Sequence, residues 1–177
     1  VHCATIMQKL VTSSREPCQK QGIFNCEMTL SGRCLNDINP PTELVELLLH
    51  LAVPQELCNK TYAVLTELFQ NSFEHGVLQL NSEIKQQEDG FFTFYQLKEE
   101  RSENLSATDS IRICLEWNAC SSELSLEILD SGQGFVIQSS LAQEHQHYGR
   151  GLSMVANLAS SLTVVAPGNH IKVVING

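Results

Sequence analysis

Glu67 and Asn71 lie four residues apart in a segment with helical periodicity, and together they could bind a metal ion and move a proton. Residues i and i+4 share one face of an α-helix. The neutral oxygen of Asn71 could hold Mg²⁺ beside bound phosphates, and Glu67 could deprotonate an attacking hydroxyl or water. Glu74 and His75, just beyond the pair, either assist the metal or are solvated. This segment alone favours the alternative of a solvated glutamate and an asparagine that bonds the backbone.

Asp130 follows the apolar run at residues 124–129, so we expect it at the end of a buried strand. A carboxylate there could accept a hydrogen bond from the exocyclic amine of adenine, which guanine lacks at that position. Gly132 and Gly134 would let the backbone approach the base and the sugar, because neither has a Cβ. The alternative is an aspartate that only initiates a turn.

The stretch Gly149-Arg150-Gly151-Leu152 precedes a second helical pattern. A glycine loop that enters a helix N-terminus offers free N–H groups and the positive end of the helix dipole to an anion. Arg150 and His147 add donors to an acidic chain, which favours an anion site over a plain helix entry. The sequence has no G-x-x-x-x-G-K-[ST] P-loop, and no strand–G-x-G-x-x-G–helix unit indicates a dinucleotide site.

The elements that must position these residues are predicted from hydrophobic periodicity. Strands neighbouring in sequence, with helices between the pairs, predict an α+β two-layer sandwich with one mixed, mostly antiparallel sheet and helices on one face. Gly76 is a plausible left-handed cap of the long helix. The predicted strands are 23–30, 111–117, 124–129, 162–166 and 170–175, and the predicted helices are 40–53, 55–75, 90–101 and 151–161. The predicted core stripe of the long helix is Cys58, Thr61, Leu65, Leu68 and Ser72.

Composition indicates one globular domain of 177 residues, 42% hydrophobic and 18% charged. The net charge of −9 argues against a nucleic-acid or membrane surface, and means that binding a polyanion such as ATP requires a cation. No apolar run approaches the ~20 residues that span a bilayer. Seven cysteines without a C-x-x-C pair are typical of reduced thiols and a cytoplasmic protein. The polar residues 1–22, without the plan of a signal peptide, are expected to be a linker or the edge of a domain, with the domain itself at 23–177.

Taken together, the three segments resemble the N, G1 and G2 boxes of the GHKL, or Bergerat-fold, ATPases, which include gyrase, histidine kinases and serine kinases of the anti-sigma-factor type. Glu67-Leu68 before Asn71, followed by His75-Gly76, resembles the anti-sigma-factor kinase branch. An insertion at about 79–110 resembles that of the kinase-like domain in bacterial response regulators that fuse a receiver, a PPM-type serine phosphatase and this ATPase. The resemblance covers roughly residues 23–176.

The resemblance implies a histidine-kinase-like ATPase fold and a site for ATP and Mg²⁺. It implies that Asn71 is the metal ligand, Glu67 the general base and Asp130 the adenine acceptor. Many kinases of this branch carry an arginine where this chain has His147, which leaves open whether transfer is slower or Arg150 substitutes. A threonine that contacts phosphate in many members is also absent here. The other residues implied in the ATP site are Gly132, Gly134, Gly149, Gly151 and Leu152.

The implied function is an ATP-dependent protein-serine kinase that phosphorylates a STAS-domain anti-sigma-factor antagonist in bacterial partner switching. The alternative is a nucleotide-gated binding module that sequesters a sigma factor, an anti-sigma factor or the antagonist without phosphorylating it. A sensor histidine kinase is disfavoured, because no segment is typical of a phospho-accepting helical hairpin.

The insertion carries four aromatic residues, Phe91, Phe92, Phe94 and Tyr95. Their helical spacing predicts that Phe91, Phe94 and Tyr95 pack on the core. Exposure of Phe92 would instead indicate docking to the fused phosphatase domain, to a second copy in a homodimer, or to the antagonist.

Overall fold

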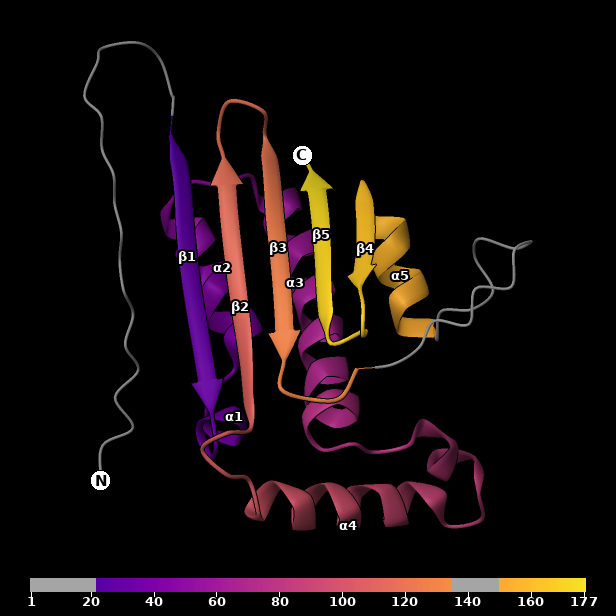
Figure 1. Cartoon of the computed structure of the whole chain (residues 1–177). Coiled ribbons are helices and arrows are strands. Elements are labelled where there is room, and N and C mark those ends of the chain that lie inside the picture. The colour runs from indigo at the N-terminus through magenta and orange to yellow at the C-terminus, as the bar shows by residue number, and fades with distance from the viewer. Residues whose placement is uncertain (1–21, 135–149) are drawn as a thin grey trace.

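The computed structural model describes residues 22–134 and 150–177, so the predicted site residues His147 and Gly149 lie outside the described residues. These residues form one sheet with helices packed on one of its faces (Figure 1). The elements, in chain order, are β1 (Ile23–Ser31), α1 (Cys34–Asp37), α2 (Pro40–His50), α3 (Gln55–Asn71), the π-helical turn η1 (Ser72–Val77), the 3₁₀ turn η2 (Ser82–Gln86), α4 (Gly90–Glu103), β2 (Ser110–Asn118), β3 (Glu123–Asp130), α5 (Arg150–Leu158), β4 (Ser161–Val165) and β5 (His170–Asn176).

The five described strands lie in the order β1-β2-β3-β5-β4, and every neighbouring pair is antiparallel. Alternate residues point to the helices, as Leu115 opposite Leu126 and Leu126 opposite Val173 illustrate, and all three are buried. The predicted α+β class is confirmed, and the arrangement fits a two-layer sandwich. The described sheet is antiparallel throughout rather than mixed, because every described strand runs antiparallel to the strands beside it.

α3 crosses the middle of the helical layer and carries the predicted core stripe (Figure 1). Its apolar members, such as Leu65 and Leu68, are fully buried, each contributing about 1.5–3 kcal/mol by burial. Thr61 is also buried, and its hydroxyl donates to the carbonyl of Leu57 at 2.8 Å, which satisfies the polar group. The strand predicted to begin at Ile23 is confirmed as β1.

The C-terminal end of the long helix differs from the prediction. α3 gives way at Ser72 to the wider π-helical turn η1, in which the N–H of Leu78 donates to the carbonyl of Phe73 at 2.8 Å. Gly76 lies inside this turn without a positive φ, so its prediction as a left-handed cap is wrong. Turns of this kind are frequent at functional sites, and here the extra width carries Gly76 to the end of β3.

The insertion forms η2 and α4, which extends along the lower end of the sheet in Figure 1. The predicted helix at 90–101 is confirmed and runs on to Glu103. Of its aromatic residues only Phe94 is buried, so the prediction that Phe91 and Tyr95 pack on the core is wrong. Only one side of α4 faces the body of the protein, and Phe94 occupies that side.

No helix within residues 22–134 and 150–177 combines the length and the apolar composition that crossing a membrane requires. Cys26, Cys58 and Cys114 are free thiols, as predicted. Cys34 takes part in a disulfide, so the prediction of uniformly reduced cysteines is wrong at that position.

Candidate functional site

The three predicted segments meet along the last turns of α3 and η1. At one end, Gly151 of α5 lies against Glu67, so closely that a Cβ on this glycine would overlap the carboxylate. At the other end, Gly76 of η1 lies against the carboxylate of Asp130, where a Cβ would also overlap it. Glu67 and Gly76 are nine residues apart on one continuous helical segment, which at 1.5 Å per residue is roughly 13 Å. The structure therefore places the two predicted acids at opposite ends of a single platform.

Glu67 and Asn71 face one another as the i, i+4 spacing predicts. The amide nitrogen Nδ2 of Asn71 donates to Oε1 of Glu67 at 2.8 Å. This hydrogen bond uses the nitrogen of the amide, whereas Mg²⁺ would require its oxygen. Among the described residues, no three His, Cys, Asp or Glu side chains gather into a metal site. A magnesium ion at Asn71 would therefore complete its shell with phosphate and water oxygens, which is its usual habit.

Glu67 also lies against the first turn of α5, through Gly151. The N–H groups of a helix N-terminus are free to bind an anion, so the carboxylate of Glu67 occupies a place close to where the sequence predicts phosphate.

Asp130 ends β3 with its side chain turned to the helical layer, where only 8% of the residue is exposed. Burial raises the pKa of Asp130 to about 6, although hydrogen bonds from the N–H of Gly132 and the hydroxyl of Ser72 oppose the rise. The Gly132 N–H lies 2.8 Å from Oδ1 of the carboxylate. At neutral pH the group is therefore an ionised acceptor in a poorly solvated place, which is what recognition of an amine requires.

Two partners of Asp130 were missed by the sequence analysis. Ser72 was assigned only to the core stripe, and it is buried, but its hydroxyl also bonds Asp130. Asn169, in the turn between β4 and β5, donates from Nδ2 to the carbonyls of Asp130 at 2.9 Å and Gly132 at 3.3 Å. The backbone carbonyl of Asn169 accepts from the N–H of Asp130 at 3.0 Å. Asn169 thus holds the loop that follows β3.

Gly134 has a conformational reason to be glycine. Its φ is +77°, and a Cβ would overlap the backbone of Pro167 in the β4–β5 turn. The turn after β3 and the β4–β5 turn are thus packed backbone to backbone. This packing fixes the direction in which the chain leaves β3.

The phosphate end of the predicted site is only partly described. Gly151 and Leu152 lie in the first turn of α5, and Leu152 packs against the core. Val155, one turn later, is fully buried and belongs to the core. His147, Gly149 and the side chain of Arg150 fall outside the described residues, so the prediction that they bind phosphate stays a prediction.

Glu74, beyond the predicted metal ligand, is neither solvated nor directed at a metal. It is buried, and its carboxylate accepts from Nζ of Lys98 at 2.8 Å and lies 3.5 Å from Nζ of Lys85. Burial raises the pKa of Glu74, but the two lysines outweigh burial and hold it below 4.5. His75 is also engaged, because its Nδ1 lies 2.6 Å from the carbonyl of Leu80. These contacts join the insertion to η1.

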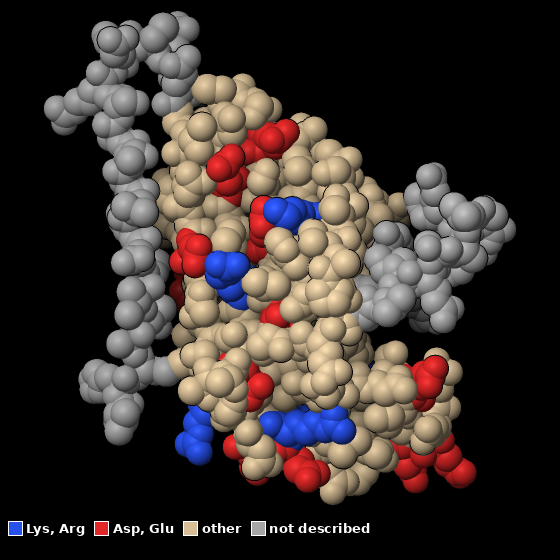
Figure 2. Space-filling view, in the orientation of Figure 1, with Lys and Arg blue, Asp and Glu red and all other residues tan. Residues whose placement is uncertain are grey.

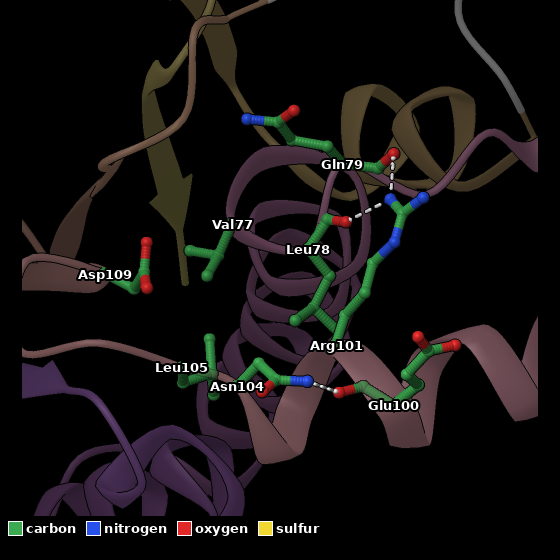
Figure 3. A pocket seen from close by; sticks show the side chains of 8 residues that line it. All are labelled: Val77, Leu78, Gln79, Glu100, Arg101, Asn104, Leu105 and Asp109. Carbon is green, nitrogen blue, oxygen red and sulfur yellow. Dashed lines mark hydrogen bonds between the residues drawn. The ribbon is translucent and has the colours of Figure 1, made fainter.

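A hollow of about 330 Å³ lies between the end of η1 and the second half of α4 (Figure 3). In Figure 3 the guanidinium of Arg101 turns away from it to the carbonyls of Leu78 and Gln79, at 2.6 and 2.8 Å. The hollow contains none of the predicted site residues. It is lined by Val77, Leu78, Gln79, Glu100, Arg101, Asn104, Leu105 and Asp109.

Comparison with protein-family models and with curated proteins finds no match for this chain. The assignment of function therefore depends on the convergence of the three segments and on the chemistry of their side chains.

Proposed function

We propose that this chain is a Bergerat-fold domain of the GHKL type that binds ATP with Mg²⁺ and phosphorylates a serine of a STAS-domain anti-sigma-factor antagonist. The observation that carries the proposal is the contact of α3 and η1 with both of the other predicted segments, through Gly151 at Glu67 and Gly76 at Asp130. Segments far apart in sequence thus lie on one platform, as a single nucleotide site would require. The two contacts are roughly 13 Å apart along it.

Asp130 would accept the exocyclic amine of adenine. Its carboxylate is ionised at neutral pH and is held by Gly132 and Ser72, so its orientation is fixed before a base arrives. Gly76 and Gly132 pack so closely around the carboxylate that a Cβ on either would overlap it, which holds the carboxylate in place. Guanine presents a carbonyl where adenine presents the amine, so an acceptor here would select adenine.

Asn71 would hold Mg²⁺ against the phosphates, and the metal would supply the positive charge that a chain of net charge −9 lacks. Glu67 would orient the serine hydroxyl and accept its proton as the hydroxyl oxygen attacks the terminal phosphorus and ADP leaves. Positioning is most of the catalysis in such a transfer. The N-terminus of α5 would contribute N–H groups to the phosphates. In the full protein, receiver and phosphatase domains would regulate or reverse this reaction.

One observation favours a second candidate, a nucleotide-gated module that sequesters a sigma factor, an anti-sigma factor or the antagonist. The carboxylate of Glu67 accepts a hydrogen bond from Nδ2 of Asn71 and lies against Gly151 at the start of α5, so it is held by contacts within the protein rather than open to a substrate hydroxyl. A protein with this arrangement could bind nucleotide and change its affinity for a partner without transferring phosphate.

The two candidates are separated by incubating the domain with ATP labelled on the terminal phosphate and with purified STAS-domain proteins. The Asn71→Ala variant is expected to lose both Mg²⁺-dependent nucleotide affinity and phosphoserine formation. Asn59→Ala is the matched control, because Asn59 is exposed on the same helix and bonds only Gln55 among the described residues. Transfer at the wild-type rate in the Asn71→Ala protein contradicts the proposal. Nucleotide binding without any phosphoserine supports the second candidate.

A further inference from the structure

Three aromatic side chains of α4 face solvent. Phe91 is 63% exposed, Phe92 73% and Tyr95 60%, and they are called the α4 aromatic surface below. Isolated exposed apolar residues are ordinary, but three large rings within two turns of one helix are a contiguous patch. Neither the hollow beside α4 nor the predicted nucleotide site includes any of them.

The exposed charge around this patch is mostly acidic. Segment 79–110 holds three basic residues, and each has a partner within the protein. Lys85 and Lys98 pair with the buried Glu74, and Arg101, although exposed, donates to backbone carbonyls. The exposed acidic residues on η2, α4 and the turn between them are more numerous, namely Glu83, Glu88, Asp89, Glu99, Glu100 and Glu103. Figure 2 shows acidic side chains gathered at the lower right of the molecule, over η2 and the start of α4.

We propose that the α4 aromatic surface is a docking site for a partner protein whose contact segment presents aliphatic side chains flanked by lysine or arginine. Aromatic residues are among those that contribute most to the free energy of binding when a partner protein buries them. The acidic rim supplies complementary charge for a basic partner and steers its approach. The proposal is independent of the kinase proposal, because it uses no residue of the nucleotide site.

The same charges disfavour other occupants. A second copy of this chain would bring one acidic rim against another, in a protein whose net charge is already −9. Anionic lipid and nucleic acid would be repelled in the same way.

The test measures binding of a fluorescent amphipathic peptide made of leucine and lysine, by anisotropy. Loss of a central aromatic contact is expected to weaken binding at least ~10-fold in Phe92→Ser and in Tyr95→Ser. The matched control is Tyr62→Ser, because Tyr62 is 44% exposed on α3, away from the patch, and its loss should leave affinity unchanged. A peptide with glutamate in place of lysine should not bind. Circular dichroism of each variant establishes that it is folded.

Several results would overturn the proposal. They are an absence of binding to the wild-type chain, equal affinity of the wild-type and Phe92→Ser proteins, and equal binding of the lysine and glutamate peptides. A dimer in sedimentation that Phe92→Ser abolishes would assign the patch to a second copy. Phe92-dependent binding to phosphatidylserine vesicles would assign it to a lipid surface.

Discussion

Replacing Asp130 with asparagine is expected to stabilise the nucleotide-free protein at neutral pH and to weaken its recognition of adenine. The carboxylate is buried and its pKa is raised to about 6, from an ordinary value of 3.8. The folded state therefore binds this proton more tightly than the unfolded state does. The contribution of the proton to the free energy of unfolding is complete below pH 3.8 and is lost as the pH rises through about 6.

The size of the effect follows from the difference between the two pKa values. One pKa unit is worth about 1.4 kcal/mol, so ionising Asp130 in the folded protein costs about 3 kcal/mol at neutral pH. Asparagine is neutral and avoids this cost, and its single oxygen can still accept from the N–H of Gly132. Allowing for a weakened bond with Ser72, we expect a gain of about 1–3 kcal/mol above pH 7. The variant would then have no spare acceptor for the adenine amine.

Urea denaturation of both proteins between pH 4 and pH 8 measures this directly. The wild-type free energy of unfolding should contain a decline of about 2–3 kcal/mol across the range that the Asp130→Asn protein lacks. Equal pH dependence in the two proteins, or a variant less stable than the wild type at neutral pH, would refute the reasoning from burial.

Two further substitutions test the contact between α5 and Glu67 and the ion pair that joins the insertion to η1. In Gly151→Ala the new methyl group would displace the flexible side chain of Glu67. Calorimetry should then show weaker Mg²⁺-dependent nucleotide binding, while the free energy of unfolding changes by less than about 1 kcal/mol. Gly22→Ala is the control, because Gly22 lies in open space. Unchanged nucleotide affinity in Gly151→Ala would contradict the predicted role of this contact. Lys98→Gln removes the nearer cation from buried Glu74 and should lower the free energy of unfolding by about 1–3 kcal/mol at neutral pH. In urea titrations this loss of stability should disappear at acid pH, where Glu74 is protonated. A loss that does not depend on pH would contradict the ion-pair account.

The secondary structure was largely predictable because its causes are local. The alternation in β2 and β3 and the helical spacing in α3 come from residues that are near one another in sequence, and both patterns are confirmed. The break at Ser72 was not predictable in this way. It depends on how Gly76 meets the end of β3, which no periodicity encodes.

The candidate site was predictable to the extent that its residues carry characteristic types and spacings. Glu67 and Asn71 form the expected pair, since a helix fixes their geometry. The side chains that hold Asp130 come from other elements, and the sequence alone does not place them. Asn169, for example, lies 39 residues further along the chain. The exposure of Phe92 was likewise undetermined, because a helical pattern says which residues share a face but not what covers it.

The central claim is tested most directly by calorimetric titration of the wild-type chain with ATP and with GTP, each with and without Mg²⁺. The account predicts that ATP binds with a requirement for Mg²⁺, that GTP binds much more weakly, and that Asp130→Asn removes this preference. Equal affinity for the two nucleotides, or ATP binding that survives unchanged in the Asp130→Asn protein, would contradict it.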